Sequence, residues 1–251
     1  MDYKLILASA STSRLKVLKS AGITAKVLVS NTDEEKILSS MHTEKFSPKL
    51  QVSTLALAKA LSIVKDICIN TREKTTSEYT HHKELALVAC DSMLEFNNKM
   101  LGKPKDKTIA IQRAKQMRGK TTTLHTGHAL VKLEREILLN MDLDTLSLPS
   151  ISSETDVQNF LETLPLKIAL NCDSTKVTFA ITKDKEIEKY VETGEPLYVA
   201  GGFTIDGYGS AFIERIDGDY NNVIGISPRV IRNLSAELDI EYTSLWDDIH
   251  K

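Results

Sequence analysis

The chain has few of the features that mark membrane proteins, secreted proteins or proteins with structural metal sites. No apolar run approaches the ~20 residues that a helix needs to cross a bilayer. The three cysteines are widely spaced and odd in number, which argues against a disulfide framework and indicates a reducing compartment. No cysteines and histidines have the spacing of a zinc site. A formal net charge of −2 gives no sign of a broad nucleic-acid-binding surface. With no leader of signal-peptide type at the N-terminus, we expect a cytoplasmic protein without membrane or stable nucleic-acid partners.

The 251 residues are 41% hydrophobic and 26% charged, as in ordinary globular proteins. Apolar runs and helical periodicities alternate along the chain, which predicts an α/β fold of one large domain, or of a domain with a second lobe. The predicted strands span residues 3–8, 25–29, 85–90, 93–96, 99–101, 121–133 and 176–182, with further short strands between 199 and 219. The predicted helices span residues 12–21, 49–67, 107–118, 154–164, 184–193 and 229–238.

The first strand is followed at once by small and hydroxyl residues and then by a helix. Ser11 or Thr12 can cap this helix, and Arg14 falls in its first turn. Free backbone N–H groups, serine hydroxyls and a guanidinium at a helix N-terminus form a cradle suited to phosphate. An ordinary βα turn with a good N-cap explains the same spacing, and on spacing alone it is the favoured interpretation.

Two charged residues stand at unusual places. Asp91 directly follows the apolar strand at 85–90, where open α/β sheets place their sites, but a strand-terminal aspartate also commonly caps a turn. Lys59 lies on or near the apolar face of the helix at 49–67, so it must either reach water or meet an anion.

Two loops carry charges that suit a phosphate group and a divalent cation. Lys103 precedes Pro104, which restricts the lysine backbone to extended geometry and fits either a fixed phosphate contact or a simple turn. Glu34 and Glu35, in a predicted acidic loop at 31–35, offer carboxylates to a divalent ion, although most such loops are merely solvated.

Each signal is weak alone, but their order along the chain is specific. The chain closely resembles the Maf family of nucleoside triphosphate pyrophosphatases, over about residues 4–133 and 176–238. The motifs that carry the resemblance are Ser9-Ala-Ser11 with Arg14, an Asp-Glu loop, Ala58-Lys59-Ala60, Asp91-Ser92, Gly102-Lys103-Pro104, Arg118-Gly119-Lys120, His125-Thr126-Gly127, Tyr190 through Gly194-Glu195-Pro196, Ala200-Gly-Gly-Phe203 and Gly218 through Gly225.

The resemblance implies an elongated mixed β-sheet flanked by helices, with two lobes around a cleft, as in the inosine triphosphate pyrophosphatase-like fold. It implies hydrolysis of a nucleoside triphosphate, standard or modified, to the monophosphate and pyrophosphate with Mg²⁺ or Mn²⁺. The proton-accepting aspartate of the family matches Asp91. Glu34, with Glu35 as a one-residue alternative, and Asp91 would hold the metal. The residues that would bind the triphosphate are Ser9, Ser11, Arg14, Lys59 and Lys103.

The chain departs from the family pattern at positions that distinguish base preference, namely Ser13, Ser92 and Asp206. Many members have arginine where Ser13 stands and threonine where Ser92 stands, and members preferring dTTP and UTP have glutamine where Asp206 stands. The preference for a base is therefore not carried over.

The whole chain, residues 1–251, is interpreted as a single Maf-like domain with two lobes. Residues 134–175 have no recognised counterpart and are interpreted as an insertion, near the cleft or at a dimer contact, and a homodimer is left open. A cell-division regulator with a vestigial cleft is the alternative function, against which the retained Asp91, Lys59 and Lys103 argue. A phosphotransferase ranks lower because the chain lacks a Gly-x-x-x-x-Gly-Lys-Ser/Thr cradle.

Overall fold

The computed structural model describes residues 4–41, 46–73 and 84–247. The chain forms two compact units. The first comprises the described residues up to Asp91, together with Gly127–Cys172 and the described residues from Ser227 onward. The second comprises Ser92–Thr126 and Asp173–Ile226. Among the described strands, three contribute residues to both units, and these are β3 (Glu84–Phe96), β5 (Thr121–Glu134) and β6 (Lys167–Phe179).

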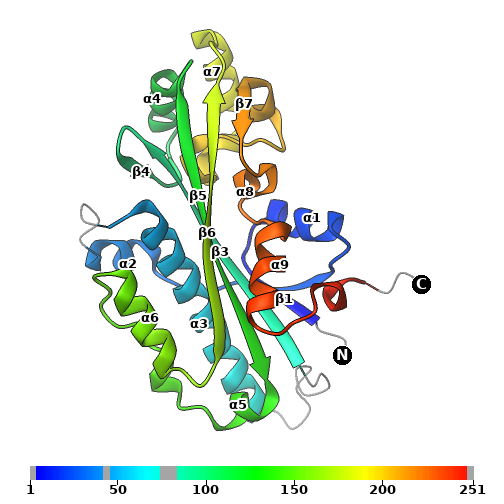
Figure 1. Ribbon diagram of the computed structural model, residues 1–251. Coiled ribbons are helices and arrows are strands. Elements are labelled where there is room, and N and C mark those ends of the chain that lie inside the picture. Colours follow the sequence, from blue (N-terminus) through cyan, green and yellow to red (C-terminus); the bar gives the residue numbers. More distant parts are fainter. Residues whose placement is uncertain (1–3, 42–45, 74–83, 248–251) are drawn as a thin grey trace. The chain divides into compact units, whose positions relative to one another are not determined.

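The described strands form one mixed, seven-stranded sheet in the order β2-β1-β3-β5-β6-β7, with β4 paired to β3. β1 (Lys4–Ala8) is parallel to β2 (Ala25–Leu28) and to β3. β4 (Lys99–Leu101) pairs antiparallel with β3, and β7 (Ile213–Asp217) pairs antiparallel with β6. Helices flank the sheet (Figure 1). The α/β class and the mixed sheet predicted from the sequence are confirmed.

In the first unit two crossovers run in opposite directions across the sheet. From β1 the chain passes through α1 (Thr12–Ser20) to β2 on one side of β1. From β2 it returns through α2 (Glu34–Ser40) and α3 (Pro48–Glu73) to β3 on the other side of β1. Parallel crossovers are almost always right-handed, so crossovers in opposite directions place their helices on opposite faces of the sheet. Accordingly, α1 and α3 cover opposite faces of this part of the sheet (Figure 1).

The residues of β3 explain why this strand is central. Leu85 through Cys90 are all buried, as expected for a parallel strand covered on both faces. Side chains alternate along a strand, and Leu85, Leu87 and Ala89 belong to the core cluster that α3 closes. The intervening residues face the opposite side.

A glycine lets α3 approach the sheet closely. At Gly127 in β5, an added Cβ would lie 2.3 Å from the carbonyl oxygen of Val52 in α3. Any larger residue there would press on the helix backbone. The closeness of this contact fixes the helix that carries Lys59.

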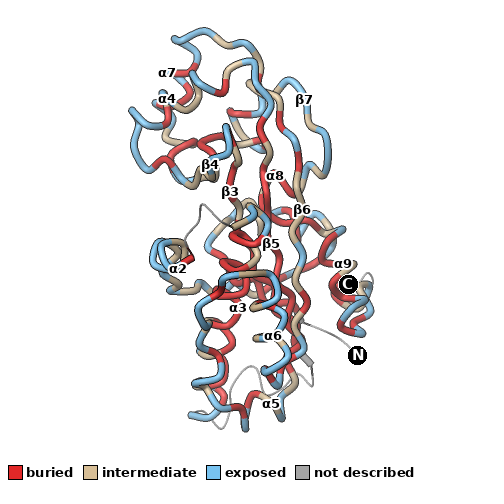
Figure 2. Tube along the Cα trace, turned by 60° about the vertical axis from the view of Figure 1, so that its left-hand side comes forward, coloured by how far each residue is buried: buried red, intermediate tan, exposed pale blue. Residues whose placement is uncertain are grey.

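The segment after β5 packs into the same core. It forms α5 (Arg135–Asn140), the 3₁₀ helix η3 (Leu143–Leu146) and α6 (Glu154–Thr163), which Ser153 caps and which confirms the helix predicted at 154–164. Leu138, Leu146 and Val157 are at most 5% exposed and lie in the cluster beneath α3. Figure 2 shows the buried stretch of α3 in red beside these elements. The segment thus supplies core side chains to the first unit, and its standing as an insertion stays a prediction.

The second unit has its own hydrophobic core and contains several short 3₁₀ helices. Phe179 and Phe203 meet edge-on at its centre, with ring centroids 5.0 Å apart. Arg118 and Lys115 both pair with Asp184, which ties the end of α4 to the start of α7. Besides β4 and β7, the unit contains α4 (Lys107–Met117), α7 (Asp184–Glu192), η4 (Glu195–Tyr198), η5 (Ala200–Gly202), η6 (Tyr208–Phe212) and α8 (Tyr220–Ile224).

Several predicted boundaries were wrong. The acidic stretch begins a helix, because Asp33 caps α2 by accepting a hydrogen bond from the Lys36 N–H. The helix predicted at 49–67 runs on to Glu73, and residues 74–83 lie outside the described part. The strands predicted at 85–90 and 93–96 are one strand, and β6 begins at Lys167. Between 199 and 212 the chain forms 3₁₀ turns instead of short strands.

The chain returns to the first unit through α9 (Pro228–Glu237) and η7 (Tyr242–Leu245). Ser227 caps α9 and Pro228 occupies its first turn, and this helix confirms the one predicted at 229–238. Within residues 4–41, 46–73 and 84–247, none of the helices combines the length and the apolar character that spanning a membrane requires.

Candidate functional site

The candidate site lies where β1 ends. Ala8, the last residue of β1, pairs with Ala89 of β3, so Ser9 and Asp91 both come just after the end of this parallel pair. β1 is also the point at which the strand order reverses, because β2 and β3 lie on its two sides. Open α/β sheets bind ligands beyond the carboxyl ends of their strands at such a switch point. Two clusters of polar side chains lie beside this position, one at the start of α1 and the other centred on Lys59 of α3.

The first cluster orders the start of α1. The Ser11 side chain caps the helix by accepting from the Arg14 N–H at 3.3 Å, and the Ser11 N–H donates to Ser9 Oγ at 3.2 Å. The Arg14 guanidinium donates through Nη1 to Ser9 Oγ at 3.2 Å and to the Cys90 carbonyl at 2.8 Å. Of the two predicted caps, Ser11 is therefore the cap. A hydroxyl pair and an oriented guanidinium at a helix N-terminus suit an anion.

The second cluster joins three charged side chains from α2, α3 and β3. The Lys59 ammonium pairs with Asp91 Oδ1 and lies 2.8 Å from Glu34 Oε1. The side chains of Lys59 and Asp91 are only 11% and 9% exposed, whereas that of Glu34 is 38% exposed. Lys59 therefore does not reach out to water from its apolar face. It meets the two carboxylates instead.

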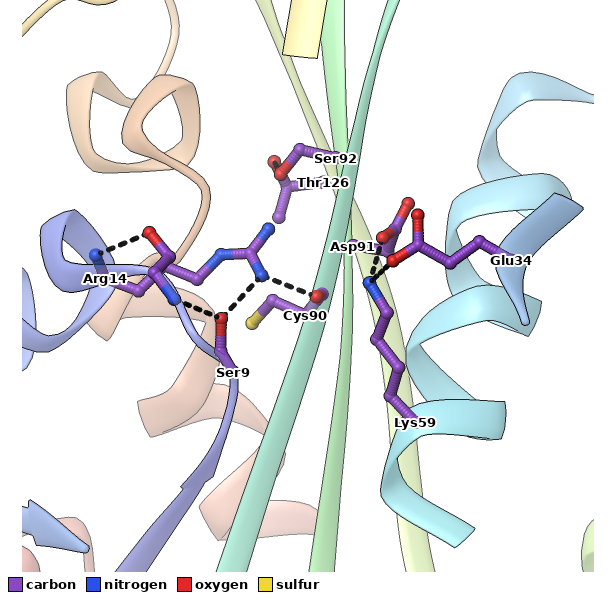
Figure 3. A network of polar contacts seen from close by, with 9 residues as sticks. Ser9, Arg14, Glu34, Lys59, Cys90, Asp91, Ser92 and Thr126 are labelled. Atoms are coloured by element: carbon purple, nitrogen blue, oxygen red, sulfur yellow. Dashed lines mark hydrogen bonds and ion pairs between the residues drawn. The ribbon is translucent and has the colours of Figure 1, made fainter. Parts of the chain in front are cut away.

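The two clusters approach β3 from opposite sides, as Figure 3 shows. Arg14 and Ser9 stand on the side of α1, while Lys59 and Glu34 stand on the side of α3. The topology accounts for this: the side chain of Asp91 continues the α3-facing row of Leu87 and Ala89 along β3.

Asp91 was predicted to follow the strand directly, but Asp91 and Cys90 both lie inside β3, and burial there controls their protonation. Removal from water raises the pKa of Asp91 above its usual value, the Lys59 ammonium opposes this shift, and the Glu34 carboxylate adds to it. Burial also raises the pKa of the Cys90 thiol to about 12, so this cysteine stays protonated at neutral pH. The raised pKa makes Asp91 more basic than an ordinary aspartate, and the protonated Cys90 has no nucleophilic role here.

The remaining predicted residues are distributed as follows. Ser13 is half-buried in α1 of the first unit, and Glu35 is exposed beside Glu34 in α2. Ser92 starts the second unit, where its hydroxyl lies 2.9 Å from Thr126 Oγ1. Lys103 and Asp206 are exposed residues of the second unit.

The loop that carries Lys103 is anchored on both sides. Arg113 donates to the Gly102 carbonyl at 2.8 Å, and the Lys105 N–H donates to the Leu197 carbonyl at 3.0 Å. Pro104 is buried between these anchors. The backbone of Lys103 is thereby held while its side chain is exposed.

Sequence reasoning missed the residue that organises the Asp206 loop. The Glu195 carboxylate accepts from the Thr204 hydroxyl and from the N–H groups of Tyr208 and Gly209 at 3.0 and 2.9 Å. Burial acts to raise the pKa of Glu195, but these hydrogen bonds outweigh it and hold the pKa below its usual value. The Gly194-Glu195-Pro196 motif marks Glu195 in the sequence but does not indicate which groups it binds.

A second unassigned network crosses three strands of the second unit. His125 lies 2.8 Å from Ser174 Oγ through Nδ1 and 3.0 Å from Glu95 Oε2 through Nε2. The His-Thr-Gly motif marks His125 in the sequence, but nothing local signals its partners, which come from β3 and β6.

The donor set was tested for a divalent cation. Within the described residues no group of three or more histidines, cysteines, aspartates and glutamates could hold a metal ion. Glu34 and Asp91 nevertheless lie close enough to share one ammonium. Mg²⁺ is commonly held by one or two carboxylates, with waters and substrate phosphates completing its shell. The two carboxylates fit that kind of site, completed by substrate.

The fold and the two clusters define a class: an α/β protein with hydroxyl, guanidinium and acidic groups at the switch point of its sheet. Comparison with known proteins makes this specific. The model of the Maf-like protein family matches residues 4–238, and the chain belongs to this family. The resemblance drawn from the motifs is confirmed.

Curated relatives carry the name nucleoside triphosphate pyrophosphatase. The protein of Salinispora tropica is 36% identical over 246 residues, covering 98% of this chain and 88% of the relative. That of Trichodesmium erythraeum is 36% identical over 242 residues, covering 96% and 98%. That of Prochlorococcus marinus is 39% identical over 225 residues, covering 89% and 91%.

Proposed function

We propose that the protein hydrolyses nucleoside triphosphates to the monophosphate and pyrophosphate by attack of water on the α-phosphorus. The observation that carries the proposal is the buried carboxylate of Asp91 at the sheet's switch point, with Lys59 beside it and the Arg14 cluster at the same strand end. The names of the curated relatives support the same reaction.

In the proposed mechanism Asp91 accepts the proton of the attacking water. Its raised pKa brings its basicity closer to neutral pH, where a general base is most effective. A carboxylate that binds a metal tightly is a poor base, so Asp91 performs one of these two tasks.

The positive groups are proposed to orient the triphosphate and to stabilise the charge on the leaving pyrophosphate. Ser9, Ser11 and Arg14 supply oriented donors, and Lys59 and Lys103 supply ammonium groups. Positioning and charge stabilisation contribute most of such a phosphoryl transfer.

We propose that Glu34 and Asp91 would hold Mg²⁺ or Mn²⁺ together with the substrate, with Glu35 as the alternative to Glu34. The cation would neutralise phosphate charge and polarise the reacting phosphoryl group. The protein's own part is to place two carboxylates on the α3 side of β3.

The base preference is left to experiment. Ser13, Ser92 and Asp206 are the proposed specificity positions, and Asp206 stands where the subgroup that prefers dTTP and UTP has glutamine. A substrate panel should therefore include both standard and modified bases. The composition and the cysteine usage support a cytoplasmic setting for the reaction.

The test is product analysis with a panel of nucleoside triphosphates and Mg²⁺ or Mn²⁺. We expect monophosphate and pyrophosphate, and a fall of about 10²–10⁴-fold in turnover for Asp91→Asn, which removes the base or a metal ligand. Asp66→Asn, an exposed change on α3, is the matched control and should keep full activity. Orthophosphate as the primary product would reject the mechanism, and equal rates for Asp91→Asn and the parent would reject the assignment of Asp91.

A further inference from the structure

The arrangement of Lys59 sets a condition on how a cation reaches the site. Its ammonium is in contact with both Glu34 and Asp91, so it stands between the two carboxylates of the α3 side (Figure 3). The Lys59 side chain is 11% exposed, and Leu55 and Ile63, one helical turn to either side, are buried. A buried ammonium needs anionic partners, and here the carboxylates provide them.

The same two carboxylates cannot serve the ammonium and a divalent cation equally. Both are positive, and both seek the oxygens of Glu34 and Asp91. Repulsion between like charges a few ångströms apart is strong in a water-poor site. A cation that enters alone must displace Lys59 from both partners and leave its charge without a counter-ion.

A nucleoside triphosphate changes this balance because its phosphates offer Lys59 other anionic partners. Lysine carries a compact charge on a flexible four-carbon stem, so its ammonium can turn to phosphate without movement of α3. The carboxylates are then free for the cation. We propose that Lys59 takes the cation's position in the nucleotide-free protein, which makes cation binding depend on the nucleotide.

This inference rests on the proposed function, since it takes Glu34 and Asp91 as the cation ligands. It adds a coupling between cation binding and nucleotide binding that the reaction alone does not require. Cation and nucleotide enhance each other's binding, and thermodynamic linkage makes that enhancement reciprocal. Removing the charge of Lys59 has opposite effects on the two ligands: nucleotide binding weakens, while binding of the cation alone strengthens.

The experiment is calorimetric titration of Mn²⁺ into the metal-stripped full chain without nucleotide. We expect Lys59→Met to bind Mn²⁺ at least tenfold more tightly than the parent, and Mn²⁺ to raise its melting temperature more. Lys65→Met, on the same helix but outside the cluster, is the matched control and should bind Mn²⁺ as the parent does. Lys59→Gln, which keeps a long polar side chain, gives a second folded variant for the same measurement.

A second titration uses an α,β-methylene triphosphate analogue, which cannot release pyrophosphate. The parent should bind Mn²⁺ at least tenfold more tightly with the analogue than without it, and in Lys59→Met this enhancement should fall several-fold. Unchanged or weaker Mn²⁺ binding by both Lys59 variants would overturn the inference even if the parent is an active pyrophosphatase. Tighter Mn²⁺ binding by the variants, with no pyrophosphate from the parent, would support the inference and reject the proposed function.

Discussion

Replacing Gly127 with alanine should destabilise the first unit through the backbone of α3. The added Cβ would lie 2.3 Å from the Val52 carbonyl oxygen, 2.4 Å from the Val52 carbonyl carbon and 2.6 Å from the Ser53 nitrogen. Ordinary contacts lie at about 3.5 Å, so the helix must retreat by roughly 1 Å. Backbone atoms cannot turn aside as a flexible side chain can.

The expected cost follows from this overlap. Overpacking of a close contact costs about 1–3 kcal/mol. The restriction of the unfolded chain by alanine returns about 0.4–1 kcal/mol. The net loss should be about 1–2 kcal/mol, which lowers the melting temperature by about 2–8 °C in a protein of this size.

The same shift should reach the site. Lys59 follows Val52 by two turns of α3, and a displacement of about 1 Å at a reacting centre can cost on the order of 10²-fold in rate. Gly127→Ala should therefore lower both stability and turnover.

Thermal and urea unfolding measure the effect against a matched control. Gly102→Ala adds the same methyl group where nothing lies within 4 Å, so it should keep only the gain from the restricted unfolded chain and be up to about 1 kcal/mol more stable than the parent. A Gly127→Ala variant as stable as Gly102→Ala would refute the close helix–sheet contact on which the reasoning depends.

Two further predictions concern the second unit's loop and the cysteines. Glu195→Gln should lose about 1–2 kcal/mol at pH 7, since an amide nitrogen cannot accept the hydrogen bonds that the carboxylate receives from Thr204 and the loop backbone. Because the pKa of Glu195 is lowered in the folded state, its contribution to the free energy of unfolding is complete above the ordinary glutamate pKa. That contribution is lost as the pH falls through the folded-state pKa. The free energy of unfolding measured in urea should therefore fall less steeply with acidification in the variant than in the parent. Glu214→Gln, an exposed change in the same unit, should unfold like the parent at both pH values, and an identical curve for Glu195→Gln would contradict the role of Glu195. In native alkylation at pH 8 followed by peptide mass analysis, the half-buried Cys172 should react while Cys90, whose pKa is about 12, should not, and equal labelling of the two would show that the Cys90 strand end is open.

Local signals predicted the elements that depend on local chemistry. Ser11, one of the two predicted caps, does cap α1, and this could be predicted because a cap and its helix lie within a few residues. The same kind of signal was overlooked at Asp33, which precedes two glutamates in the first turn of α2. An acidic stretch was interpreted as a loop, although acidic residues also favour a helix N-terminus.

Elements fixed by distant partners could not be predicted in this way. The turns between 199 and 212 depend on Glu195, whose carboxylate gathers donors from Thr204 to Gly209. Glycine-rich spacing alone suggested short strands there. Tertiary hydrogen bonds outweighed that local pattern.

The candidate site divides along the same line. The residue types were predicted, since Lys59 on an apolar face and Asp91 directly after an apolar run are anomalies that a sequence displays. Their partnership was not predicted, because 32 residues separate Lys59 from Asp91 and only the crossover through α3 brings them together. The resemblance named these residues, and the structure added that one ammonium holds both carboxylates.

The most direct test of the central claim is hydrolysis in ¹⁸O-labelled water under single-turnover conditions, with the position of the label read by mass spectrometry. Attack at the α-phosphorus predicts one ¹⁸O atom in the nucleoside monophosphate and none in pyrophosphate. Label in pyrophosphate, or label in released orthophosphate as the first product, would contradict the account.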